Sequence, residues 1–157
     1  MQSQGIAVAA LVGAVGQEQA KTGLVTALAV GKGVRNIVAG SLAVRDWWHH
    51  QKHAGELNVV AVDSSPAALG QANQLWIGYS HLAGLTTAGF QRHEGNLEQA
   101  GWLAQVRPRA PFDLIILANS LNELYVGAND PIAARTKFVA DTLSLLAPSG
   151  TMMILEP

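Results

Sequence analysis

Apolar runs alternate with helical patterns along most of the chain. Three runs predict strands over Leu57–Asp63, Phe112–Ala118 and Thr151–Leu155, and a weaker run predicts another over Leu85–Gln91. Apolar residues at successive positions fit parallel strands that are covered by helices on both faces. Apolar residues at helical spacing predict helices over Pro66–Leu82, Leu97–Val106 and Pro131–Leu146. The alternation predicts an α/β fold, a Rossmann-like parallel sheet with right-handed crossovers.

Two assignments fit the first strand. In the preferred one, Val34–Gly40 is the strand and Ser41–His53 is the next helix. In the other, Leu24–Val30 is the strand, Gly31-Lys32-Gly33 is the loop and a long helix runs from Val34 to His53. Related dinucleotide-binding folds place an acidic residue about 20 residues after the glycine loop. The distance to Asp63 favours Gly40, so we divide the chain into an N-terminal apolar segment (1–33), a packing helix or extra strand, and a Rossmann-like domain (34–157).

Size and composition indicate one well-packed domain. The 157 residues suffice for a single core, and with 49% hydrophobic and 13% charged residues little of the chain is expected to be disordered. The formal charge of −1 provides no long-range attraction to nucleic acid or to an anionic membrane. The absence of cysteine excludes disulfides, thiolate metal sites and cysteine nucleophiles.

Neither a membrane span nor a secretory signal is expected. The uncharged runs Gly5–Gly16 and Gly23–Val30 are each shorter than the roughly 20 residues that cross a bilayer. No Lys or Arg precedes Lys21, whereas a secretory signal begins with positive charge. We therefore expect a cytoplasmic protein without membrane contact.

Asp63 closes an apolar strand and is followed by Ser64-Ser65-Pro66, a typical helix start. Ligands of open α/β sheets lie outside the carboxyl ends of the strands. A carboxylate at this position can accept hydrogen bonds from the two hydroxyls of a ribose. It can equally be an ordinary helix cap, and the residues alone leave both interpretations open.

The last third of the chain resembles a known class of enzymes. The segments Phe112–Ala118, Asn119-Ser120-Leu121-Asn122-Glu123-Leu124 and Leu145–Pro157 resemble class I S-adenosylmethionine-dependent methyltransferases. The Leu-Asn-Glu-Leu after strand four and the Glu-Pro after strand five are most similar to the mitochondrial small-subunit ribosomal methyltransferase-like family and its bacterial relatives. The resemblance implies a strand order of 3-2-1-4-5, S-adenosylmethionine as cofactor, and RNA, in particular ribosomal RNA, or a ribosomal subunit as partner.

The resemblance also implies roles for individual residues. Residues that would lie beside the transferred methyl group are Asn119, Asn122 and Glu123. Residues that would bind the cofactor are Asn36, Gly40, Asp63, Ser64, Asn96 and Leu97. Of these, Asp63 matches the acid that binds the cofactor ribose, and Asn96 stands where an aspartate near the adenine is common. The alternative for Asn122 and Glu123 is that they cap the next helix or face solvent, since short polar residues after a strand are common caps.

Two departures from the class support other functions. Around Gly40 the chain has one glycine where the class has a Gly-x-Gly-x-Gly-like loop, which favours a non-catalytic or dimerising module that has lost the cofactor. The class continues beyond strand five, so an exposed apolar edge over Met152–Leu155 is expected to pair in a homodimer or with the N-terminal segment. An NAD-binding Rossmann protein is a third interpretation, since an acid after strand two suits that cofactor equally.

Other chemical motifs are weak. His49 and His53 share a helical face, but no third ligand accompanies them, so we expect no metal site. The basic residues Arg92, Arg107, Arg109, Arg135 and Lys137 are scattered, which is more typical of ordinary surface charge than of an RNA-binding cluster.

Overall fold

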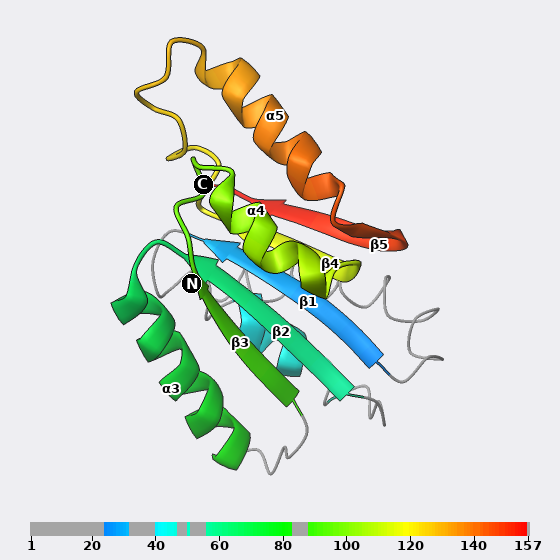
Figure 1. Cartoon of the computed structure of the whole chain (residues 1–157). Helices are drawn as coiled ribbons and strands as arrows, with labels where there is room; N and C mark the ends of the chain where they lie inside the picture. Colours follow the sequence, from blue (N-terminus) through cyan, green and yellow to red (C-terminus); the bar gives the residue numbers. More distant parts are fainter. Residues whose placement is uncertain (1–23, 32–39, 47–49, 51–55, 83–87, 157) are drawn as a thin grey trace.

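The protein contains a five-stranded parallel sheet in the order β3-β2-β1-β4-β5 (Figure 1). The structure is a computed structural model that describes residues 24–31, 40–46, 50, 56–82 and 88–156. The strands are β1 (Leu24–Gly31), β2 (Glu56–Asp63), β3 (Ala88–Glu94), β4 (Phe112–Ala118) and β5 (Leu146–Leu155). The labelled helices are α3 (Pro66–Leu82), α4 (Gly101–Val106) and α5 (Pro131–Leu143), and a short 3-10 helix covers Arg107–Arg109. The Rossmann-like architecture and the strand order expected from the sequence are confirmed.

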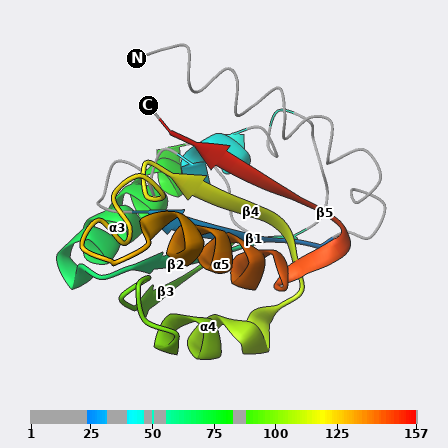
Figure 2. The ribbon, with the colours of Figure 1, turned by 90° about the horizontal axis from the view of Figure 1, so that it is seen from above.

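Helices pack on both faces of the sheet and create two apolar cores. On one face, α3 and the helical residues 40–46 contribute Leu69, Trp76 and Val44 to a core with alternate residues of the strands. On the other face, α4 and α5 contribute Trp102 and Phe138. Figure 2 shows α4 and α5 on the side of the sheet opposite to residues 40–46. The central strands are therefore buried on both sides, which explains their continuous apolar runs.

The preferred assignment of the first strand is wrong, because the central strand is Leu24–Gly31. It pairs in register with β2 on one side and β4 on the other, for example Leu28 with Val60 and Ile115. Gly40, expected at the end of a strand, is instead helical and buried. A Cβ atom there would lie 3.4 Å from Cγ2 of Ile116, an ordinary packing distance, so Gly40 lies against β4 without a close approach that requires glycine.

The predicted domain boundary at residue 33 depended on the assignment of the first strand to Val34–Gly40. Residues 24–31 are the middle strand of the sheet and thus part of the Rossmann-like fold. Residues 1–23 and 32–39, the latter including Asn36, lie outside the described part of the chain.

Four other elements differ in extent from the prediction, and α5 ends at Leu143 rather than at the predicted Leu146. β3 covers Ala88–Glu94, a few residues beyond the predicted run, and α4 begins only at Gly101 after turns over residues 97–100. β5 begins at Leu146, ahead of the predicted strand Thr151–Leu155, and it contains an irregularity at the predicted turn, Pro148-Ser149-Gly150, since Phe112 pairs with Leu146 but Leu114 pairs with Thr151. The strand therefore starts before the turn and resumes after it, which periodicity cannot reveal.

Helix starts follow the predicted capping chemistry. The Ser65 hydroxyl accepts the Ala68 N–H (3.2 Å) just before α3 begins at Pro66. Asp130 Oδ1 accepts the Ala133 N–H (2.9 Å) before α5 begins at Pro131. A side-chain oxygen thus binds one of the backbone donors that a helix start leaves unpaired. None of the described helices is long and apolar enough to cross a membrane.

Candidate functional site

The carboxyl ends of all five strands meet at one edge of the sheet, where their arrowheads point in Figure 1. The chain order reverses between β1 and β4, and ligands of open α/β sheets bind beside such a switch point. Asp63 ends β2 next to β1, Glu94 ends β3, and residues 119–124 follow β4. Most of the predicted site residues in the described part of the chain therefore lie along this edge.

Asp63 is buried, with 1% of its surface exposed. Its Oδ1 accepts the Ser65 N–H at 2.7 Å, and its backbone oxygen accepts the Gly95 N–H at 3.0 Å. The carboxylate thus shapes the turn before α3 and the backbone joins the tips of β2 and β3, while Ser65 caps the helix itself. Ser65, rather than Asp63, is therefore the residue that caps α3. The binding of a ribose by Asp63 remains a prediction.

A shallow cavity of about 390 Å³ lies beside Asp63, at the tips of β2 and β3. It is lined by Ser64, Glu94, Gly95, Asn96, Gln99, Gly101, Trp102 and Gln105. Gly95 packs tightly here, since a Cβ atom on it would lie 2.8 Å from Cβ of Trp102. The amide oxygen of Asn96 accepts the Glu98 N–H at 3.0 Å, which orients its side chain. Two predicted cofactor residues, Ser64 and Asn96, thus share one cavity.

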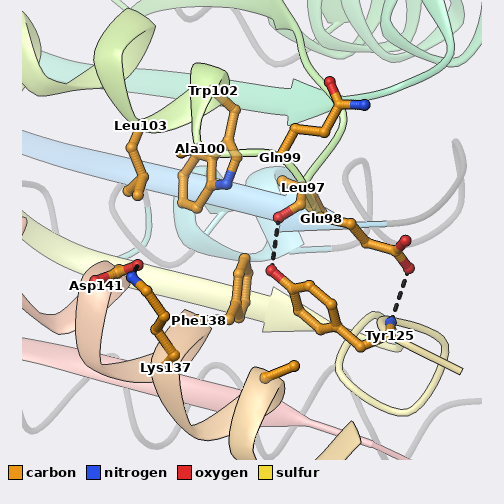
Figure 3. Close-up of a pocket in the computed structure, with 11 residues that line it drawn as sticks. Leu97, Glu98, Gln99, Ala100, Trp102, Leu103, Tyr125, Lys137, Phe138 and Asp141 are labelled. Carbon is orange, nitrogen blue, oxygen red and sulfur yellow. Dashed lines mark hydrogen bonds and ion pairs between the residues drawn. The ribbon is translucent and has the colours of Figure 1, made fainter. Parts of the chain in front are cut away.

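Leu97, a third predicted cofactor residue, is buried and lines a second cavity of about 200 Å³ between the β3–α4 loop and α5 (Figure 3). The walls of this cavity include the aromatic rings of Trp102, Tyr125 and Phe138. The Tyr125 hydroxyl donates to the Leu97 carbonyl (3.2 Å), and the Tyr125 N–H donates to Glu98 Oε1 (2.8 Å). Tyr125, at φ 60°, therefore links the loop after β4 to the loop after β3.

The loop after β4 is tied to the end of β5. Asn119 adopts a left-handed conformation (φ 48°), which asparagine tolerates better than most residues, and its N–H donates to the Leu155 oxygen at 2.8 Å. The Glu156 carboxylate accepts the next three N–H groups, from Ser120 and Leu121 on Oε1 (3.1 and 2.8 Å) and from Asn122 on Oε2 (3.3 Å). The two segments that carry the family resemblance therefore form one hydrogen-bonded unit.

Arg135 of α5 holds the same loop from the other side. Its guanidinium donates to the backbone oxygens of Leu124 (2.9 Å) and Asn122 (2.8 Å). The side chains of Asn122 and Glu123 are exposed, so both can face a bound molecule. The alternative in which they cap the next helix is wrong, because Asp130 caps α5.

Ser120 is fully buried (0% exposed), and its Oγ has no hydrogen-bond partner within the described part of the chain. Buried hydroxyl groups usually have a hydrogen-bond partner, so the Ser120 hydroxyl, which lies beside the switch point of the sheet, is an exception. No pattern in the sequence marked Ser120, Glu156, Tyr125 or Arg135 as site residues. The only signal for Glu156 was its place in the Glu-Pro pair after strand five.

Several groups near this edge have shifted pKa values. Burial, and then the positive charge of Arg109, lower the pKa of His93 on β3. Burial, and then the nearby Glu98, raise the pKa of Tyr125. Within the described residues no three His, Asp or Glu side chains are grouped to hold a metal, and His49 and His53 lie outside these residues. Carboxylates, amides and backbone groups at this edge can bind and orient a ligand.

Comparisons with known proteins add no assignment. No protein-family model matches the chain, and no curated protein matches it.

Proposed function

We propose that this protein is an S-adenosylmethionine-dependent methyltransferase that acts in the cytoplasm on RNA, in particular ribosomal RNA, or in ribosome assembly. The observation that carries the proposal is the buried carboxylate of Asp63 at the end of β2, where the next residue, Ser64, lines a cavity together with Asn96. The proposal extends the family resemblance of the β4 and β5 segments, and the Rossmann-like fold is compatible with it.

The residues present fit a nucleoside cofactor. The cavity of about 390 Å³ is within the range of small-molecule sites and has both polar and apolar walls. Asp63 would accept hydrogen bonds from the ribose hydroxyls, and Ser64 and Asn96 would lie along the base, whereas Leu97 lines the second cavity. The corrected position of β1 adds support, because β1 ends at Gly31 and the sequence continues with Lys32-Gly33, which gives a Gly-x-Gly pair in place of the lone Gly40.

The cofactor would supply an electrophilic methyl group, and the chain would supply position. Residues 119–124 are held from both sides, so Asn119, Asn122 and Glu123 would orient the acceptor against that methyl group. Holding two reactants in one geometry removes much of the entropic barrier to their reaction. The rate would thus depend on how well this loop is placed rather than on a strong acid or base.

A non-catalytic module with the same fold is the second candidate. The observation that favours it is the burial of Asp63, whose Oδ1 already accepts the Ser65 N–H. NAD as ligand is a third candidate, because an acid after the second strand serves either cofactor.

Calorimetric titration with S-adenosylmethionine, S-adenosylhomocysteine and NAD separates the three candidates. Binding of S-adenosylhomocysteine without a response to NAD is the result expected for the methyltransferase. Binding of NAD alone would replace it with the dinucleotide function, and silence toward all three would leave the non-catalytic module.

We also propose that two copies pair through β5, the last strand in the sheet. Its Ile154 side chain is 42% exposed, and strand edges with apolar residues tend to pair. Analytical ultracentrifugation is expected to show a dimer that Ile154→Lys converts to a monomer. A monomer at all concentrations for the unmodified chain would refute the pairing.

A further inference from the structure

One carboxylate organises the start of the loop after β4. The three successive N–H groups of Ser120, Leu121 and Asn122 all donate to Glu156, two to Oε1 and one to Oε2. Hydrogen bonds to an ionised acceptor are shorter and stronger than neutral ones. Glu156 follows β5, more than thirty residues farther along the chain, so this contact exists only because β4 and β5 are neighbours in the sheet.

Further hydrogen bonds on either side of these three N–H groups also hold the loop backbone in place. The Asn119 N–H is bound to the Leu155 oxygen, and the positive φ of Asn119 turns the next residues toward the end of β5. Arg135 then binds the Asn122 oxygen, so both backbone groups of Asn122 are held by charged side chains of opposite sign. Because the backbone of Asn122 is held at both groups, its exposed side chain projects from a defined position at the edge of the sheet.

A second carboxylate contacts the loop farther along it, since Glu98 accepts the N–H of Tyr125. It faces the second cavity rather than residues 119–122. Glu156 is thus the acidic group that determines the backbone position of the residues proposed to face the acceptor.

We propose that Glu156 is a positioning residue, which holds the backbone of residues 120–122 so that Asn119 and Asn122 are set for the reaction. The role rests on the proposed methyltransferase function. Glu156 acts on the reaction through its hydrogen bonds to the loop backbone. It does not contact the substrate in this proposal.

The test compares Glu156→Gln with a matched control, Asp130→Asn, in the full chain. The glutamine side chain has the same size, but only one oxygen, so it cannot accept all three N–H groups. The control removes one negative charge at the other end of the β4–α5 connection. Asn caps a helix as well as Asp does, so the hydrogen bond to the Ala133 N–H is kept. Glu156→Asp keeps the charge but is one methylene shorter.

Three readouts are measured on each variant. Amide hydrogen exchange at residues 120–122 reports the anchor directly. Calorimetry with S-adenosylhomocysteine reports cofactor binding. Transfer of a labelled methyl group from saturating S-adenosylmethionine to purified small-subunit ribosomal RNA reports kcat and the KM for RNA.

In Glu156→Gln we expect exchange at residues 120–122 to be about tenfold faster or more, because charge-assisted hydrogen bonds are lost. We expect kcat to fall roughly tenfold to a hundredfold, since small misplacements have effects of that size. The affinity for S-adenosylhomocysteine should change less than about twofold, as Glu156 does not line the cavity beside Asp63. Asp130→Asn should match the unmodified protein, and Glu156→Asp should recover part of kcat.

Unchanged exchange in Glu156→Gln would refute the anchor. Faster exchange with unchanged kcat would refute the positioning role and leave a purely structural contact. If the unmodified protein binds no S-adenosylhomocysteine and transfers no methyl group, the proposed function and the positioning role fail together. The exchange data would then still decide whether Glu156 anchors the loop.

Discussion

Asp63→Asn separates the two interpretations of the carboxylate at the end of β2. The amide has the size of the carboxylate, and its oxygen can still accept the Ser65 N–H that Oδ1 accepts at 2.7 Å. The turn before α3 is therefore retained, and we expect the domain to stay folded. What the substitution removes is the negative charge and one of the two acceptor oxygens.

The expected loss of affinity follows from two hydrogen bonds. A ribose donates one hydroxyl to each carboxylate oxygen in the proposed arrangement. Losing one charge-assisted bond costs about 2 kcal/mol, and weakening the other from charged to neutral costs about 1 kcal/mol. Together they predict a roughly hundredfold rise in the Kd for S-adenosylhomocysteine.

Calorimetry with S-adenosylhomocysteine on Asp63→Asn measures this rise, and Ser65→Ala is its matched control. The control removes the hydroxyl that accepts the Ala68 N–H at 3.2 Å, so it should lower the free energy of unfolding by about 1 kcal/mol. Its ligand affinity should be unchanged. If Asp63→Asn binds as tightly as the unmodified protein, the carboxylate does not hold the ribose and the proposed site is misplaced.

Three further predictions concern the fold. Trp102→Ala empties a core site that is 2% exposed, so we expect a loss of about 3–5 kcal/mol in the free energy of unfolding in urea. Gly150→Ala would place a Cβ atom 2.8 Å from a backbone oxygen of β4, and about 1–3 kcal/mol should be lost in the same assay; an unchanged midpoint would contradict this packing. Burial, and then the hydrogen bond to Asp46, raise the pKa of Tyr79 to about 12 from its ordinary 10.0. The contribution of Tyr79 to the free energy of unfolding is therefore complete below pH 10 and is lost as the pH rises through about 12. An ultraviolet titration of Tyr125→Phe, which leaves Tyr79 as the remaining tyrosine, should show this ionisation, and titration near 10 would refute it.

The sheet itself could be predicted from local patterns. Leu57–Asp63 and Phe112–Ala118 are continuous apolar runs of strand length, and both coincide closely with β2 and β4. These strands are covered on both faces, so nearly every side chain must be apolar, and the pattern is visible without knowledge of the partners.

The first strand could not be chosen in the same way. Leu24–Gly31 and Val34–Gly40 are both stretches of strand length that end in glycine after apolar residues, and a spacing rule favoured the wrong one. The rule assumes a short connection from the glycine loop to the acid, whereas here residues 40–46 and 50 are helical between β1 and β2. Pairing with β2 and β4 decides the register, and that pairing is a property of the assembled sheet.

The sequence by itself determined the α/β class and the position of Asp63 at the end of a strand, because both depend on residues that are adjacent along the chain. Only the tertiary structure decided that Leu24–Gly31 is the central strand and that Glu156 binds residues 120–122. Backbone N–H groups are the same at every position, so no side-chain pattern shows which carboxylate will bind them. The parallel pairing of β4 with β5 brings the two segments to one edge, and this places Glu156 against the loop.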